Sequence, residues 1–449
     1  MSNFASLVFW GICSIFLFHL VQPHKKLKVL LSLFFSLSFI FYFTSFFAMS
    51  ALVVWSSLVY FLGQKTQLQH HYRWYYFAIV VIFCIFKFDA FDSGHKNALL
   101  DSIVPIGFSF IMFQSIAYLR DLKQNELHRE HSYLTYLGGT LFFPTLLAGP
   151  FCKFQVYLDG LNSSWNHSRV FHGFALASMG LCKFALSGFI VKNSIIGSMP
   201  LVPTSETHSL NLLILGSIYL YLNFSGYSDF VVGLGKLLGF EIPLNFKFPY
   251  LSTSMAEYWR NWHITLGHWF RDQVFFPLSH VLNRKLTFFS TRHNTKIAVF
   301  VTFFLIGIWH EFSWQVLFYA LANAFFVTFL SPTSIRQTQK LLLIPLNFFS
   351  IILINGIFVS KSLDDYFGIV KRLAIFDPEK SFEKEIRLLL FSIVLLLFIY
   401  FSEKTIEKLA QYELLSPWDL FKTVLLTGVL ILLTLTVGFS GVEATYVGY

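Results

Sequence analysis

Long uninterrupted apolar runs recur along almost the whole chain, and they constrain its fold more than any other feature. Most of them approach the ~20 residues that a helix needs to cross the hydrocarbon core of a bilayer. A helix satisfies its backbone hydrogen bonds within one segment, so it suits that environment. The runs cover residues 4–21, 29–47, 51–62, 74–91, 103–119, 142–150, 170–190, 210–238, 298–330, 341–359, 388–401 and 424–439.

The composition agrees with this interpretation. Of the 449 residues, 55% are hydrophobic and only 13% are charged, whereas soluble domains carry about 25% charged residues. The 57 phenylalanines are too many for one globular core. We therefore expect an all-α polytopic membrane protein with about ten or eleven crossings. Because no repeat, low-complexity tract or linker divides the chain, residues 1–449 are predicted to form a single membrane-embedded domain.

Two of the runs have the wrong length for one simple crossing. Residues 142–150 are too few to span and include Pro144, Gly149 and Pro150. Irregular backbone of this kind is tolerated at membrane depth only where protein surrounds it, so a re-entrant segment is expected. Residues 298–330 are long enough to bend or to form two helices.

The net charge of +9 is spread over short connecting segments. No compact basic arm or basic helix points to a nucleic-acid partner. The loop with His24, Lys25, Lys26 and Lys28 should face the cytoplasm, since basic loops favour that side. The residues before it lack a basic n-region and a cleavage site, so they are expected to form a retained helix with the N-terminus outside.

Residues 249–280 are too polar for a crossing that faces lipid, although they are rich in aromatic residues. A continuous helix ended by Pro277 would account for the segment. An interfacial amphipathic helix is the alternative. Helical spacing would place four apolar side chains on one stripe. They are Trp259, Trp262, Leu266 and Trp269.

The strongest candidates for chemistry are His263 and His310. Each follows a tryptophan in largely apolar surroundings, where a polar ring usually lines a functional cavity. A neutral imidazole can take a proton from a hydroxyl and return it to a leaving group, which suits acyl transfer to an alcohol. A satisfied core histidine and a proton relay for transport remain open alternatives.

Other reaction classes lack their motifs. The chain has no Gly-x-Ser-x-Gly nucleophile elbow and no Walker-type phosphate loop. Its four cysteines lie in apolar stretches without metal-type spacing, and the histidines near His263 are not spaced as ligand pairs. No metal site is therefore predicted.

An ordered series of motifs through most of the chain resembles the membrane-bound O-acyltransferase (MBOAT) family. The resemblance is closest to the bacterial branch with alginate O-acetyltransferases and teichoic acid D-alanyltransferases. The series consists of Pro105-Ile-Gly-Phe-Ser-Phe110, Phe113-Gln114, Tyr118-Leu-Arg-Asp121, Phe142-Phe-Pro-Thr-Leu-Leu-Ala-Gly-Pro150, Gly180-Leu-Cys-Lys183, Phe224-Ser-Gly-Tyr-Ser-Asp229, Gly239-Phe-Glu-Ile-Pro-Leu-Asn-Phe246, Pro249-Tyr250, Tyr258-Trp-Arg-Asn-Trp-His263, Trp269-Phe-Arg-Asp272 and Gly307-Ile-Trp-His310. The motif core lies within residues 101–330.

The resemblance implies a helical bundle with re-entrant segments and a central tunnel. It implies that His310 is the catalytic general base and that His263 lines the same channel. Further channel residues are expected beside the two histidines. They are Trp259, Arg260, Asn261, Trp262, Arg271, Asp272, Trp309 and Glu311. Glu311 stands where the family usually has glycine, so it could orient or charge-stabilise His310.

By resemblance, the donor is a cytoplasmic acyl thioester, either acyl-CoA or an acyl carrier protein, and no cofactor is bound tightly. The acceptor is a hydroxyl of an exported cell-surface polymer, a polysaccharide or a teichoic-acid-like chain, reached with or without an extracytoplasmic partner protein. Acetyl is favoured over D-alanyl. The expected location is the bacterial cytoplasmic (inner) membrane. The rival from another class is a proton-coupled transporter or flippase of polymer precursors.

Overall fold

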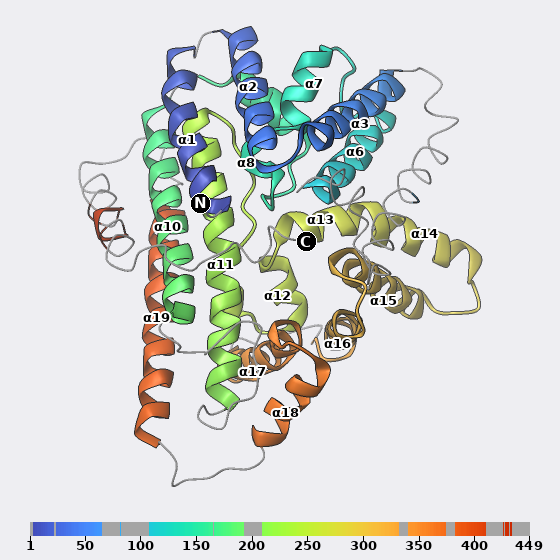
Figure 1. The fold of residues 1–449 in the computed structure, drawn as a ribbon. Helices are drawn as coiled ribbons and strands as arrows, with labels where there is room; N and C mark the ends of the chain where they lie inside the picture. Colours follow the sequence, from blue (N-terminus) through green and yellow to red (C-terminus); the bar gives the residue numbers. More distant parts are fainter. Residues whose placement is uncertain are drawn as a thin grey trace. The chain divides into compact units, whose positions relative to one another are not determined.

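The computed structural model describes residues 3–21, 24–64, 81, 107–164, 166–192, 209–331, 340–373, 382–409, 425, 427–430 and 432. Within these residues every regular element is a helix (Figure 1), as expected for an all-α membrane protein. The longer helices are α1 (Asn3–Leu20), α2 (Lys25–Phe43), α3 (Phe46–Gln64), α6 (Phe108–Lys123), α10 (His167–Lys192), α11 (Ser209–Leu238), α15 (Thr291–His310), α16 (Trp314–Phe329), α17 (Lys340–Val359), α18 (Leu363–Leu373) and α19 (Phe382–Leu409).

Six helices of the described part are long and apolar enough to cross a membrane, namely α2, α3, α10, α11, α17 and α19. Two shorter apolar helical stretches fall below that length, namely Ser6–Leu20 of α1 and Trp314–Phe329, which is α16. The run 74–91 and most of 424–439 lie outside the described residues. The multi-pass architecture is thus confirmed, and the figure of ten or eleven crossings stays a prediction.

The chain divides into two compact units. The first contains residues 1–177, 227–244 and 443–449, and the second contains 178–226 and 245–442. Helices α10 and α11 run through both units, and small residues let them pack closely. A Cβ on Gly233 would lie 2.4 Å from the backbone N of Ala177, and one on Gly226 would lie 2.7 Å from the N of Phe184. Such contacts are typical of helices in lipid, where association depends on close packing.

The first unit contains the irregular segment predicted for residues 142–150. Only a four-residue helix, α8 (Phe143–Leu146), interrupts it, and every residue from 142 to 150 is buried. Gly107 approaches it with φ of +86°, and a Cβ there would lie 2.4 Å from the carbonyl oxygen of Leu146. Only glycine tolerates both the positive φ and so close an approach of another backbone. The protein therefore shields this irregular backbone, as a re-entrant segment requires.

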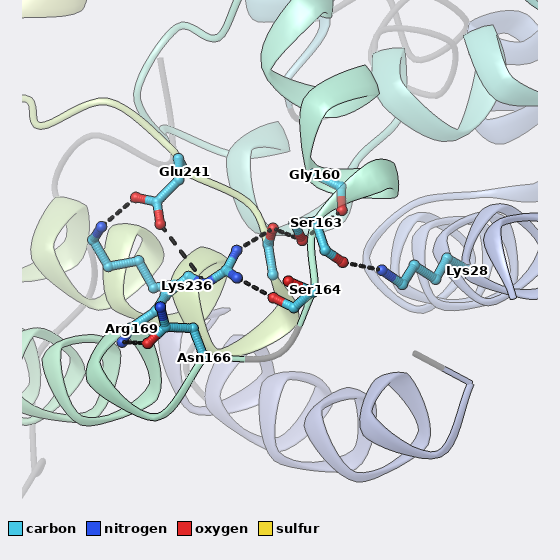
Figure 2. Close-up of polar contacts among 9 residues, drawn as sticks. Lys28, Gly160, Ser163, Ser164, Asn166, Arg169, Lys236 and Glu241 are labelled. Carbon is cyan, nitrogen blue, oxygen red and sulfur yellow. Dashed lines mark hydrogen bonds and ion pairs between the residues drawn. The ribbon is translucent and has the colours of Figure 1, made fainter. Parts of the chain in front are cut away.

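Cations tie several helix ends together in the same unit (Figure 2). Lys28 of α2 donates to the carbonyl oxygen of Ser163 at 3.0 Å, just beyond α9 (Phe154–Asn162). Arg169 in the first turn of α10 donates to the carbonyl oxygen of Gly239, beyond the end of α11. Lys236 and Arg169 both pair with Glu241. The first turns of α2 and α10 and the last turn of α11 therefore meet in one basic cluster.

The run 298–330 forms two helices in the second unit, which is one of the two alternatives expected from its length. Helix α15 ends at His310, and Ser313 begins α16 by accepting a hydrogen bond from the backbone N–H of Val316. A Cβ on Gly307 would lie 2.9 Å from Cβ of Ala320, so the two helices pack closely there. The break between them places His310 at a helix end.

Candidate active site

The segment 249–285 is folded as a series of short helices, so the expectation of one continuous helix was wrong. It contains η1 (Pro249–Leu251), α12 (Met255–Asn261), α13 (Ile264–Phe270), a π-helical turn η2 (Arg271–Phe275) and α14 (Phe276–Lys285). The chain turns sharply between α12 and α13 (Figure 1). The four apolar side chains 259, 262, 266 and 269 consequently share no helical stripe.

The break occurs at His263, whose φ of +44° and ψ of +52° place it in the left-handed region. This conformation is costly for a residue other than glycine and needs compensation from its surroundings. Helix α12 also begins on specific contacts, because Ser254 accepts from the backbone N–H of Glu257 and the Glu257 carboxylate accepts from the N–H of Thr253. The segment is therefore fixed on the N-terminal side of the break as well.

Pro277 does not end a helix, which corrects the second expectation about this segment. It lies in the first turn of α14. The π-helical turn directly before it, in which the backbone N–H of Phe276 pairs with the Arg271 carbonyl, is a local adjustment of the kind that accommodates proline inside a helix. The chain continues to Lys285 without interruption.

Asn245 provides the compensation at the corner. Its buried side-chain Oδ1 accepts from the backbone N–H of Thr265 at 3.3 Å and from the Thr265 hydroxyl at 2.9 Å. Nδ1 of His263 lies 3.1 Å from the same oxygen. The backbone N–H of Ile264 donates to the Asn245 carbonyl at 2.9 Å, and that of Lys247 to the Asn261 carbonyl at 3.0 Å. Five hydrogen bonds thus join residues 245–247 to the corner.

These contacts assign the tautomer of His263. The N–H of Thr265 can only donate, so the Asn245 atom facing it must be the amide oxygen. An amide oxygen only accepts, so the neutral His263 ring must carry its proton on Nδ1. Nε2 is then the ring nitrogen that can accept a hydrogen bond.

Aromatic side chains enclose His263, which is 3% exposed. The Phe224 ring of α11 meets it edge-on at 4.8 Å between centroids. The preceding Trp262 is stacked on Tyr258 at 5.5 Å and meets Phe246 edge-on at 5.0 Å. The ring thus has flat apolar walls, and its Nδ1 is oriented by Asn245.

His310 lies at the C-terminal end of α15 and is only half-buried. Its ring is 4.4 Å from that of Trp309, which is itself buried, and 5.9 Å from that of Phe358 on α17. Glu311 is exposed, and its backbone N–H closes the helix on the carbonyl of Gly307 at 3.0 Å. This contact involves the backbone of Glu311 alone. That its carboxylate orients or charge-stabilises His310 stays a prediction.

The two histidines interact electrostatically. His263 lies outside the six candidate spans. Burial lowers the pKa of His263 well below its ordinary value, and His310 lowers that pKa further when it is positively charged. Both residues belong to the second unit. The two imidazoles that the sequence singled out therefore lie near enough for the charge of His310 to act on His263, with 46 residues of chain between them.

The remaining predicted channel residues divide into two groups. Trp259 belongs with the site elements: its Nε1 donates to Oδ1 of Asn323 at 3.0 Å, and its ring meets Phe303 edge-on at 5.2 Å. Arg260 is exposed, and the side chain of Asn261 donates to the Glu257 carbonyl within its own helix.

Arg271 and Asp272, both expected to line the channel, form an ion pair at 2.8 Å between Nε and Oδ1. The pair joins neighbouring residues on the π-helical turn, and Arg271 is exposed above the Phe276 ring. Among the described residues, no group of three or more His, Cys, Asp or Glu side chains could hold a metal ion.

Sequence reasoning did not select Asn245, Phe224 or Asn323 for the site. Asn245 belongs to one of the motifs that resemble the family, Gly239-Phe-Glu-Ile-Pro-Leu-Asn-Phe246. No local feature of the sequence linked it to a histidine 18 residues away. Asn323 is the one amide side chain between residues 316 and 330 of an apolar run. A lone amide in such a run indicates a specific hydrogen-bond partner elsewhere in the fold, because a buried amide needs one.

Comparison with known proteins points to one family. Residues 30–362 match the sequence profile of MBOAT, the membrane-bound O-acyltransferase family. The probable alginate O-acetylase AlgI of Pseudomonas putida is 34% identical over 261 residues, which cover 53% of this chain and 51% of that protein. The teichoic acid D-alanyltransferase of Streptococcus thermophilus is 27% identical over 60% of this chain and 67% of its own length.

The peptidoglycan O-acetyltransferase of Helicobacter pylori is 26% identical over 55% of this chain and 52% of its own length. The chain thus spans about half the length of most of these relatives. The family profile nevertheless covers well over half of the chain, and it includes both histidines and the whole corner between α12 and α13. This chain belongs to the membrane-bound O-acyltransferase family.

Proposed function

We propose that this protein is a membrane O-acyltransferase that moves an acyl group from a cytoplasmic thioester to a hydroxyl of an exported cell-surface polymer. The observation that carries the proposal is the presence of His263 and His310 in the same unit, each with its ring against aromatic side chains. Membership of the family supports the reaction class.

In this mechanism His310 is the general base. Its imidazole takes the proton from the acceptor hydroxyl while that oxygen attacks the thioester carbonyl carbon. The new C–O ester bond forms, the C–S bond breaks, and the imidazolium returns its proton to the departing thiolate. The partial negative charge at the end of α15 stabilises the positive charge that His310 acquires during the step.

The assignment of the base to His310 follows from the difference between the two rings. His263 is 3% exposed and burial keeps it neutral, whereas His310 is only half-buried. His310 is therefore assigned the role of the base, because its ring is the more accessible of the two. His263, oriented by Asn245, positions a reactant from its Nε2 side.

Acetyl is the favoured acyl group, because the alginate O-acetylases are more similar to this chain than the D-alanyltransferases are, at 34% against 27% identity for the two quoted. No cofactor bound tightly is required. The donor is acyl-CoA or an acyl carrier protein, and both are anionic. Residues 273–310 contain no acidic residue, and Arg284, Lys285 and Arg292 are exposed there. This basic surface complements an anionic donor.

The proposed location is the bacterial inner membrane. The basic cluster of Lys28, Arg169 and Lys236 supports a cytoplasmic position for the first turn of α2, since cytoplasmic ends of spanning helices carry an excess of lysine and arginine. The N-terminus of α1 would then lie outside, on the side where the polymer acceptor and any extracytoplasmic partner protein are reached.

The test compares surface polymers from cells that carry the wild-type chain, His310→Ala or no copy. Mass analysis should find the ester lost with His310→Ala, by about a hundredfold or more for removal of a general base. His128→Ala is the matched control, because His128 is an exposed imidazole outside residues 273–310. Intact acylation with lost polymer export in His310→Ala would instead favour a proton-coupled transporter or flippase.

A further inference from the structure

Three polar side chains meet inside candidate membrane spans of the second unit. Lys183 lies on α10, Tyr221 on α11 and Glu403 on α19. The Lys183 ammonium and the Tyr221 hydroxyl both donate to the same carboxylate oxygen, Oε1 of Glu403. The Lys183 Nζ also lies 5.2 Å from the centre of the Tyr221 ring. The three groups therefore form one hydrogen-bonded cluster.

The burial of this cluster makes its presence informative. Lys183 is 1% exposed and the Glu403 side chain is 19% exposed. Charged side chains within membrane segments are costly, and where they occur they are usually functional. A buried ion pair also adds little net stability compared with apolar residues of the same volume. The cluster thus calls for a role beyond holding α10 against α19.

Tyr221 connects the cluster to the corner at His263. Its ring meets Phe246 edge-on at 5.9 Å and lies 6.2 Å from the ring of Trp262. Phe224, one turn later on the same helix, meets both Phe246 and His263. The hydroxyl of Tyr221 faces Glu403, while its ring supports the residue that precedes the site histidine.

Helix α19 contacts the same aromatic group at a second point. Tyr400, one turn before Glu403, packs against Phe248 at 5.1 Å between ring centroids. Phe248 in turn meets the Tyr221 ring edge-on at 6.0 Å. Helix α19 therefore reaches the aromatic group through Tyr400 and Glu403, which lie more than 130 residues beyond His263 in the sequence.

We infer that Lys183, Glu403 and Tyr221 are positioning residues for the His263 corner. Glu403 fixes the Tyr221 ring by accepting from its hydroxyl, and Lys183 neutralises Glu403 so that the carboxylate stays at that depth. The fixed ring holds Trp262 and, through it, the left-handed His263. This assignment rests on the proposed acyl transfer for its kinetic consequences only, since the geometry of the corner can be measured without turnover.

The first experiment uses Tyr221→Phe, which keeps the ring and removes only its hydroxyl. In purified protein with an acyl thioester donor and a polymer acceptor, kcat should fall about tenfold, because small misplacements of a positioning group are costly. KM for the donor should stay within about twofold of the wild-type value, since the basic donor surface is untouched. Tyr136→Phe, which removes a buried hydroxyl on α7 (Tyr133–Thr140), is the matched control.

The second experiment separates the positioning of Tyr221 from the effect of leaving Glu403 without its cation. Lys183→Met alone leaves Glu403 as an uncompensated buried carboxylate and should reduce kcat together with thermal stability. Adding Glu403→Gln removes that charge, and the Gln carbonyl still accepts from the Tyr221 hydroxyl. The double variant should therefore recover most of the turnover lost in Lys183→Met. A double variant as inactive as the single one would overturn the assignment.

The third experiment does not depend on acylation. Protein labelled with 5-fluorotryptophan gives one ¹⁹F signal for Trp262, assigned by its loss in Trp262→Phe. Tyr221→Phe should shift or broaden that signal, and Tyr136→Phe should leave it in place. If the wild type transfers no acyl group but the Trp262 signal responds, the proposed function fails and the positioning role stands. An unmoved signal, or wild-type kcat in Tyr221→Phe with lowered thermal stability, would show that the cluster is only structural.

Discussion

Oδ1 of Asn245 lies 3.1 Å from Nδ1 of His263, and this contact orients the imidazole at the break between α12 and α13. The same oxygen accepts two hydrogen bonds from Thr265. One side chain thus stabilises a left-handed residue, sets its tautomer and begins the next helix. The corner depends on this amide more than on any residue of the segment itself.

Asn245→Leu should therefore damage both stability and turnover. The substitution leaves the N–H of Thr265 and Nδ1 of His263 buried without their acceptor, which costs about 1–3 kcal/mol for each unsatisfied group. Thermal unfolding in detergent should show the loss, and acyl transfer per folded molecule should also fall. Thr265→Val removes only the hydroxyl donor and serves as a milder control. Equal effects of the two substitutions would contradict the role assigned to the amide.

The stability of the protein should fall below about pH 6.5 partly because of His263. Burial, and then His310, hold the pKa of His263 below the ordinary value of 6.5. Between the folded and unfolded pKa values the unfolded chain binds more protons, so stability decreases as the pH falls through that window. The melting temperature, measured at several pH values, should change less with pH in His263→Gln than in the wild type. An identical pH dependence in wild type and variant would remove His263 as the cause.

Cys152→Ser should retain acyl transfer. Burial raises the pKa of the Cys152 thiol to about 12, so it carries almost no thiolate at neutral pH and is a poor nucleophile. The residue lines a cavity with Tyr118 and Tyr157 in the first unit, away from both site histidines in sequence. Intact-protein mass spectrometry during turnover checks whether Cys152 becomes acylated. An acyl adduct on Cys152 would require a covalent mechanism instead.

Asp272→Asn should change the free energy of unfolding by less than about 1 kcal/mol, because its partner Arg271 is exposed and such pairs contribute little. If the pair lines the channel and contacts the donor, KM for the thioester should still change. The two readouts are independent. A large loss of stability with an unchanged KM would assign the pair to the structure of the π-helical turn.

The membrane orientation can be checked with single cysteines in a chain whose four native cysteines have been replaced. Lys26→Cys, at an exposed position in the first turn of α2, should react with an impermeant maleimide only after the cells are opened. Ser45→Cys, between α2 and α3, should react in intact cells if α2 spans the membrane. The reverse pattern would place the N-terminus inside.

Much of the helical architecture was predictable because it depends on local properties. The apolar runs 4–21, 170–190 and 210–238 correspond to α1, α10 and α11, since length and apolarity are properties of each segment alone. The irregular run 142–150 was identified from its short length and its prolines. His263 and His310 were also found from local surroundings, as polar rings that follow tryptophans in apolar sequence.

The tertiary structure decided the features that depend on distant partners. Helical spacing in residues 249–280 favoured one helix, but the hydrogen bonds of Asn245 stabilise a left-handed residue in its middle. Glu403 pairs with Lys183, 220 residues earlier in the chain. Local sequence determined where this chain forms helices and which histidines are candidates. Packing determined where a helix breaks and which charges meet. A left-handed residue and a buried charge are both costly, and only groups that the fold brings together offset those costs.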